Sequence, residues 1–368
     1  MTSDITRCYG SVQVRLVDER RKRLPTLPRL VGACLLISHS IACQNGASES
    51  GPAEAPQAPA SVTSFTGGAV GNLGPARVAV NPVTNRIYVT NEFSGSVSVI
   101  DGATNTTVAQ ISVGNFPFGV AVNPQTNRIY VANTSSGTVS VIDGESNTVS
   151  ATVPVELSPK GVGINPVTNR IYVTNFASES VSIMDGATDN VIGSIAVETA
   201  PIAVDVDPEA NRIYVSNMSS NTVSFIDASS DAIVATVKVG VGKVDPFAVR
   251  LNGTTNRVYT ANFNTNEVSV IDFASASIIA AVRVGTEPRD VAVNPNTNRI
   301  YVANTGSNDV SIIDGTTSGV IGTLPVGAKP LGVAVNPETN RVYVANAGDD
   351  TVSVIDGAND TVITTVAL

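Results

Sequence analysis

Histidine, tryptophan and cysteine are nearly missing from this chain of 368 residues, and their scarcity excludes several kinds of chemistry. Tryptophan is absent, the one histidine is His39, and the three cysteines are Cys8, Cys34 and Cys43. From residue 44 onward the sequence therefore has no Ser-His-Asp triad, no Cys-His pair, no disulfide and no histidine-ligated metal. No glycine-rich phosphate loop follows a strand either. We expect no cofactor, no metal site and no catalytic constellation.

Charged residues are also sparse, at 14%, and aromatic residues make up only 5%. The formal net charge is −9, and residues 43–368 alone carry 15 basic and 28 acidic groups, a net charge of −13. A chain this acidic binds nucleic acid and anionic lipid poorly. We expect no nucleic-acid partner, and contact with a membrane only through a covalent lipid.

The N-terminal segment has the pattern of an export signal. Basic residues between Arg20 and Arg29 precede a 13-residue apolar stretch, Leu30 to Ala42, which is too short to span a bilayer. Small residues in Ser40-Ile41-Ala42 predict cleavage before Cys43, and this tripeptide resembles a lipobox with Cys43 as the lipidated residue. We predict a signal peptide at 1–42 and a disordered Ala/Pro/Ser-rich tether at 43–66. Ordinary signal cleavage that leaves Cys43 a free thiol is the alternative.

Seven near-identical repeats fill residues 67–368. An Asn-Arg-Ile/Val-Tyr segment recurs at spacings of 42, 42, 42, 45, 42 and 42 residues, and two other markers, an aspartate and a proline, repeat with it. The proline marker occupies Pro75, Pro117, Pro159, Pro201, Pro246, Pro288 and Pro330. The three extra residues of the fourth interval therefore lie between Asp227 and Pro246.

Each repeat contains four short β-branched runs separated by turn residues. In the second repeat, strand A is Val120 to Val122, strand B is Arg128 to Ala132, strand C is Val139 to Ile142, and strand D is Val149 to Val155. Four antiparallel strands in about 42 residues predict one propeller blade. The fold prediction is therefore an all-β, seven-bladed propeller, with each blade contiguous in sequence. Val62 to Val70 is a weak match to a further outer strand.

The repeated tetrapeptides Tyr88-Val89-Thr90-Asn91 and Tyr172-Val173-Thr174-Asn175 resemble the motif of the YVTN family of β-propeller repeats. The resemblance covers about residues 70–368. It implies a surface-layer, secreted or envelope protein of archaea or bacteria, with no shared catalytic residues.

Residues repeated in every blade are most simply structural. The tyrosines of strand B (Tyr88 and its equivalents) are expected to bury their rings and to find a hydroxyl partner. The repeat arginines (Arg86 and its equivalents) and aspartates (Asp101 and its equivalents) are expected to pair within or between blades. The Asp-Gly segments suit turns better than calcium loops, because alternating carboxylates are missing.

Function, if it is local, is expected where the repeats differ. The A–B turns are nearly uniform, whereas the D–A and B–C loops, which share the opposite face of a propeller, are variable. Six of the nine phenylalanines are placed there, namely Phe93, Phe116, Phe118, Phe176, Phe247 and Phe263. Five basic residues outside the repeat arginines also belong to D–A loops, namely Arg77, Lys160, Lys243, Arg289 and Lys329.

Aromatic and cationic groups around a concave mouth predict a binding site. We assign it to Arg77, Phe93, Phe118, Lys160, Phe176, Phe247, Phe263, Arg289 and Lys329. Loops that are merely variable and solvated are the alternative.

One position in the middle of strand A departs from its small-residue pattern. It is Asp205 in the fourth repeat and Arg250 in the fifth, against alanine or glycine in the others. We predict a partly buried Asp205–Arg250 ion pair that lines the central channel, either to fill a gap or as a functional site.

The sequence therefore favours a non-enzymatic, monomeric binding scaffold of the bacterial cell envelope, with a protein or glycan as partner. It would be lipid-anchored at Cys43, or periplasmic or extracellular. A structural surface-layer or matrix component is the first alternative. A carboxylate-based hydrolase or lactonase is the second, although no carboxylate pair stands out.

Overall fold

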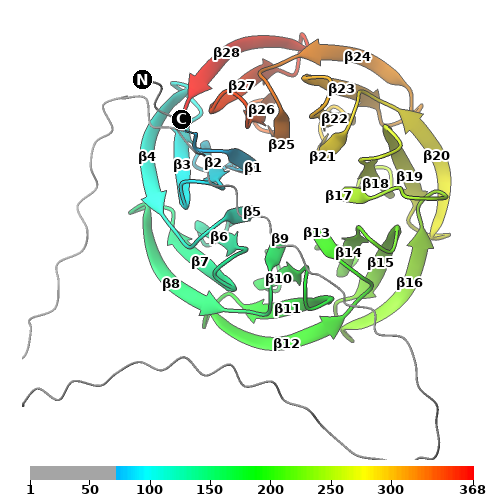
Figure 1. Cartoon of the computed structure of the whole chain (residues 1–368), viewed down its shortest axis with the longest axis horizontal. Helices are drawn as coiled ribbons and strands as arrows, with labels where there is room; N and C mark the ends of the chain where they lie inside the picture. Colours follow the sequence, from blue (N-terminus) through cyan, green and yellow to red (C-terminus); the bar gives the residue numbers. More distant parts are fainter. Residues whose placement is uncertain (1–71) are drawn as a thin grey trace, which may run out of the picture. The chain divides into compact units, whose positions relative to one another are not determined.

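A computed structural model describes residues 72–368 as seven four-stranded antiparallel sheets arranged in a ring (Figure 1). Every sheet follows sequence order, from β1-β2-β3-β4 to β25-β26-β27-β28, so the predicted seven-bladed propeller of contiguous blades is confirmed. The predicted signal peptide, the tether with Cys43, and the segment Val62 to Val70 lie outside the described residues. Within residues 72–368 no helix has the length and apolar character needed to cross a membrane.

The strands of the first four blades are short and evenly spaced. They are β1 Pro75–Asn81, β2 Arg86–Asn91, β3 Ser96–Asp101, β4 Thr106–Ser112, β5 Pro117–Asn123, β6 Arg128–Asn133, β7 Thr138–Asp143, β8 Thr148–Pro154, β9 Pro159–Asn165, β10 Arg170–Asn175, β11 Ser180–Asp185, β12 Asn190–Ala196, β13 Pro201–Asp207, β14 Arg212–Asn217, β15 Thr222–Asp227 and β16 Ala232–Lys238.

The last three blades repeat the same plan. Their strands are β17 Pro246–Asn252, β18 Arg257–Asn262, β19 Glu267–Asp272, β20 Ser277–Arg283, β21 Pro288–Asn294, β22 Arg299–Asn304, β23 Asp309–Asp314, β24 Val320–Pro325, β25 Pro330–Asn336, β26 Arg341–Asn346, β27 Thr351–Asp356 and β28 Thr361–Ala367. The predicted insertion is the 239–245 loop between β16 and β17, whose tip residue Val241 is 92% exposed.

The hydrophobic core lies between blades rather than within them. Seven clusters of buried side chains each join two neighbouring blades, and together they cover all seven junctions. At the junction of the first two blades, for example, Tyr88 and Val97 pack against Ile129 and Val131. One blade alone would leave this apolar face in water, so the array has to close on itself.

Asparagine side chains join neighbouring blades on the face of the A–B turns. The last asparagine of each innermost strand donates its amide to the asparagine that precedes strand B of the next blade, as Asn81 does to Asn127 at 2.7 Å. Six of the seven junctions have this bond, including Asn336 to Asn85, which closes the ring at 2.9 Å. The accepting asparagines have positive φ near 52°, a conformation that asparagine tolerates.

The repeat arginines and aspartates have different roles. The aspartates cap the C–D turns, as Asp101 does by accepting the N–H groups of Ala103 and Thr104, and these bonds lower the pKa of Asp101. Several arginines reach the next blade, as Arg128 does to Asp189 at 2.8 Å, whereas Arg86 pairs with Asp101 inside its own blade. Pairing of a repeat arginine with a repeat aspartate is therefore confirmed within a blade, by Arg86 and Asp101. Between blades the partner is a different carboxylate, such as Asp189, which lies four residues after the repeat aspartate Asp185. The turn role of the aspartates holds.

The seven repeat tyrosines are fully buried, as predicted. Burial raises the pKa of Tyr88 to about 12. Their hydroxyls form no hydrogen bond of normal geometry within residues 72–368, so the expectation of a hydroxyl partner was wrong. The rings pack in the apolar clusters between neighbouring blades.

The fourth blade lacks the asparagine bond, because Asp207 stands where other blades have asparagine and a carboxylate has no N–H to donate. We expect Asp207→Asn to raise stability by about 1 kcal/mol through a new bond to Asn256. The reciprocal change Asn165→Asp is expected to lower it by a similar amount. Urea unfolding midpoints measure both, and an unchanged or lower midpoint for Asp207→Asn would contradict the asparagine ring.

Candidate functional site

The D–A and B–C loops form one face of the ring, and side chains of the chain itself cover its centre. Backbone bonds such as Phe93 N to Leu73 O, 3.0 Å, join the two kinds of loop. An eighth apolar cluster gathers Ala76, Phe118 and Ile202 with partly buried Phe176, Met218 and Phe247, from five different blades. The sequence predicted aromatic and cationic groups around a concave mouth at this face. Instead, these residues fill the mouth.

Cations and aromatic rings alternate across this cover. The Lys160 ammonium lies 4.3 Å from the centre of the Phe118 ring, and the Arg77 guanidinium lies between Phe118 and Phe247, at 4.7 and 5.4 Å. The Arg289 guanidinium then lies 4.9 Å from the Phe247 ring and 4.6 Å from the Phe263 ring. We call Lys160, Phe118, Arg77, Phe247, Arg289 and Phe263 the cation–aromatic array. Each contact at these distances is attractive and limits the movement of the side chains.

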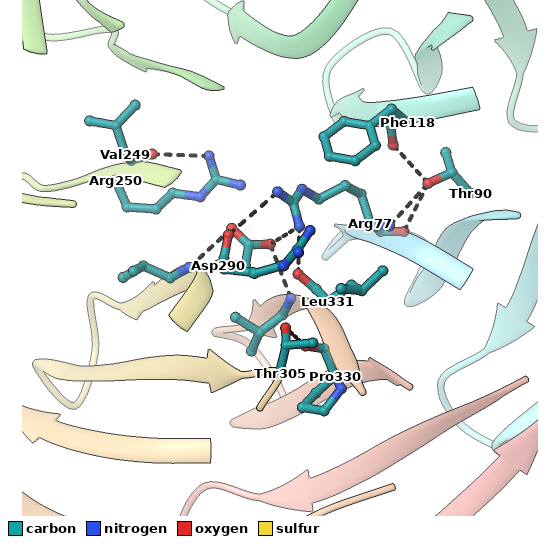
Figure 2. A network of polar contacts seen from close by, with 12 residues as sticks. Arg77, Thr90, Phe118, Val249, Arg250, Asp290, Thr305, Pro330 and Leu331 are labelled. Carbon is teal, nitrogen blue, oxygen red and sulfur yellow. Dashed lines mark hydrogen bonds and ion pairs between the residues drawn. The ribbon is translucent and has the colours of Figure 1, made fainter. Parts of the chain in front are cut away.

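Beneath the array, Arg77 pairs with Asp290 across the first and sixth blades, 3.9 Å apart, with both side chains buried (Figure 2). Arg77 also donates to the carbonyl of Leu331. Asp290 accepts the N–H groups of Val291 and Val333 at 3.0 and 3.1 Å. The cavity at this level measures only about 30 Å³. The pair and the array therefore close the channel at this face.

The predicted Asp205–Arg250 ion pair does not form, so that prediction was wrong. Arg250 turns to the carbonyl of Val249 at 3.3 Å, as Figure 2 shows, and Asp205 accepts the N–H of Leu251 at 2.6 Å. Both half-buried side chains do line the channel, in a cavity of about 340 Å³ with aliphatic walls. Each charged side chain therefore has a hydrogen-bond partner in the nearby backbone instead of the opposite charge. Burial raises the pKa of Asp205.

Three of the nine predicted binding residues, Phe93, Phe176 and Lys329, are not part of the array. Phe93 is 58% exposed at the rim and contacts Phe116 edge to face, with the ring centres 6.3 Å apart. Phe93, Arg289 and exposed Lys329 line a groove of about 830 Å³ over the first, sixth and seventh blades. Arg289 belongs to both the groove and the array. Phe176 packs against the eighth cluster.

The structure therefore divides the nine predicted binding residues by depth. Arg77 and Phe118 are buried and cannot offer much surface to a ligand. Five side chains are half-buried, namely Lys160, Phe176, Phe247, Phe263 and Arg289, and Phe93 and Lys329 are exposed. Burial lowers the pKa of Lys160 and of Arg289, because both cations lose water.

Sequence reasoning missed Asp290 as the partner of Arg77, although a signal was present. The second residue after the marker proline is small in five blades and is Arg77 and Asp290 in the other two. Only small residues fit easily there, because a Cβ on Gly161 would lie 2.8 Å from the carbonyl oxygen of Ile202. Two opposite charges at this otherwise small position of the repeat were the sequence signal for the Arg77–Asp290 pair.

Comparisons with known proteins agree with the fold. The family model described as a YNCE-like beta-propeller matches residues 164–294, little more than a third of the chain. A PE-PGRS family protein, PE_PGRS18 of Mycobacterium tuberculosis (strain ATCC 25618 / H37Rv), is 58% identical over 45 residues. That match covers 12% of this chain and 10% of the relative, about one blade repeat. The chain is a β-propeller repeat protein.

Solved structures show the same architecture at low sequence identity. Hydrazine synthase of Kuenenia stuttgartiensis superposes with a TM-score of 0.71 at 20% identity, over 79% of this chain and 98% of that one. The structure of U3-55K has a TM-score of 0.68 at 12% identity, over 76% of this chain and 90% of its own. Both likenesses concern the fold.

Across residues 72–368 no three His, Cys, Asp or Glu side chains gather as metal ligands would.

A double-mutant cycle tests the buried pair. Asp290→Ala is expected to lower the free energy of unfolding by about 3 kcal/mol, because it leaves the Arg77 charge buried without its partner. The double variant with Arg77→Ala is expected to lose at least about 1 kcal/mol less than the sum of the two single losses. Urea unfolding measures all four proteins. Purely additive losses would show that the two charges do not interact.

Proposed function

We propose that this propeller is a non-enzymatic binding scaffold that captures a cell-envelope protein or glycan through its D–A/B–C face. The carrying observation is the cation–aromatic array, assembled from five blades at the one face where the repeats diverge. Its side chains are held in place before any partner arrives, which lowers the entropy lost on binding. The residues that build it are also the ones that depart from the repeat.

The cations of the array support a role in recognition. Neither Lys160 nor Arg289 is in an ion pair within residues 72–368, and Nε of Arg289 is buried without a hydrogen-bond partner there. Cations without an ion-pair partner can donate charge-assisted hydrogen bonds to a ligand acceptor. Because the chain as a whole is acidic, this basic centre differs in charge from the rest of the molecule.

The proposed location is the bacterial envelope, with the mature chain anchored by a lipid on Cys43. The support is the sequence: the basic and apolar segments before Cys43, the lipobox-like tripeptide, and the Ala/Pro/Ser-rich residues 43–66 that suit a tether. Metabolic labelling with a fatty-acid analogue tests the anchor. We expect label in the wild-type protein and none in Cys43→Ser. An unlabelled wild-type protein would contradict the lipid anchor and favour ordinary signal cleavage with Cys43 as a free thiol.

A second candidate, a surface-layer or matrix component, is favoured by the outer strands. Five consecutive blades expose two adjacent aliphatic side chains at the bulge of their outermost strand, namely Val191 and Ile192, Ile233 and Val234, Ile278 and Ile279, Val320 and Ile321, and Val362 and Ile363. A repeated apolar edge can mediate lateral contacts. Light scattering at micromolar concentration decides, because a strictly monomeric protein contradicts this candidate.

The binding proposal is tested by removing the two unpaired cations. Lys160→Ala with Arg289→Ala is expected to reduce capture of a ligand from a cell-envelope extract at least about tenfold, since two charge-assisted contacts are lost. Lys238→Ala with Arg283→Ala, at the exposed ends of β16 and β20, removes the same charge elsewhere and is expected to capture normally. Equal capture by the two double variants would refute the array as the binding centre.

A further inference from the structure

Three departures from the repeat meet at the rim of the first and second blades. The second residue after the strand-B asparagine is Phe93 in the first blade and Ser, Ala, Asn or Gly in all others. The residue before the marker proline is Phe116 in the second blade and Gly74 in the first. These two phenylalanines form the exposed edge-to-face pair described above. Divergence at separate positions thus produces one exposed aromatic surface.

The backbone is built to hold these rings outward. Every residue before a marker proline has positive φ, and Phe116, at 51°, is a bulky aromatic side chain in that conformation. This turn is a feature of every blade, so the backbone fixes the direction of the side chain at this position, and Phe116 occupies it at the cost of some strain. Gly74 seats the other ring, because a Cβ there would lie 2.5 Å from Cδ2 of Phe93. One side of the Phe93 ring therefore rests on backbone while the side chain stays 58% exposed.

Polar hollows lie on both sides of Phe93. One measures about 230 Å³ and is lined by Glu92, Ser94, Asn115, Phe116 and Ser135. The other is the groove of about 830 Å³, in which Thr305 and Asn308 accompany Arg289, Lys329, Glu287 and Asp350. Two cations and two carboxylates balance in this groove, and Asp350 already accepts the N–H groups of Leu73 and Gly74. The surroundings are therefore rich in hydrogen-bonding groups, the larger groove is balanced in charge, and the smaller hollow adds the single carboxylate Glu92.

We infer that Phe93 and Phe116 form a stacking platform for a neutral hexopyranose of an oligosaccharide that continues into both hollows. This inference rests on the proposed binding function and names the ligand class. The C–H face of a pyranose matches the electron-rich face of a phenyl ring, while its hydroxyls match mixed donors and acceptors at the edge. The charge balance argues against an acidic sugar at this subsite. An extended peptide is the competing occupant.

Substitutions taken from the protein's own repeats test the platform. Phe93→Ser copies the second blade, and Phe116→Gly copies the first blade and relieves the positive-φ strain, so both variants are expected to fold. Leu157→Ser, also on a D–A loop and 68% exposed, is the matched control. Thermal melting verifies that each variant is folded before binding is measured.

Titration calorimetry with hexasaccharides of glucose, mannose or N-acetylglucosamine, a galacturonate hexamer and a proline-rich decapeptide gives the readout. We expect saturable binding of at least one neutral hexasaccharide, weakened roughly tenfold by Phe93→Ser or Phe116→Gly and unchanged by Leu157→Ser. No neutral binding, binding of galacturonate or peptide alone, or neutral binding unaffected by both variants would overturn the platform. If envelope capture still depends on Lys160 and Arg289 in those cases, the proposed function stands without this subsite.

Discussion

The close approach of neighbouring innermost strands is the constraint on which this ring depends. Seven strands meet around one axis, and at the second residue after the marker proline a Cβ on Gly332 would lie 2.7 Å from the carbonyl oxygen of Ala76. Glycine and alanine satisfy this geometry in five blades. A larger residue there has to send its side chain into the axis. Arg77 and Asp290 do so, and the attraction between their opposite charges offsets part of the cost of burying them.

From this constraint follows the difference between the two faces. On the face of the A–B turns, six asparagine bonds repeat with almost the same geometry, and each needs the same residues in its turn. On the other face, large and charged side chains converge over a channel already closed by Arg77 and Asp290. A ligand therefore meets a filled, ordered surface with a lateral groove, rather than an open funnel.

The sequence predicted the architecture well because each repeat carries all four strands and their turn residues. It predicted which face gathers these aromatic and cationic side chains, but not how deeply each one is buried. Phe118 is buried and Phe93 is exposed. Their burial depends on the radius of the ring of blades and on side chains from blades across the axis. The sequence pattern of one blade contains neither kind of information. The Asp205–Arg250 pairing failed for a similar reason, because adjacent positions in neighbouring blades do not ensure that side chains turn toward each other.

Asp350 has a consequence for the way this ring was assembled. Its side chain accepts the N–H groups of Leu73 and Gly74 ahead of β1, and its backbone carbonyl accepts the N–H of Leu368 after β28. The two ends of the propeller therefore meet at one residue, and every blade is contiguous. Such a ring has no privileged starting blade. A circular permutant opened in the 239–245 loop would keep all seven blades whole, as expected of a ring that arose by tandem duplication of a single unit.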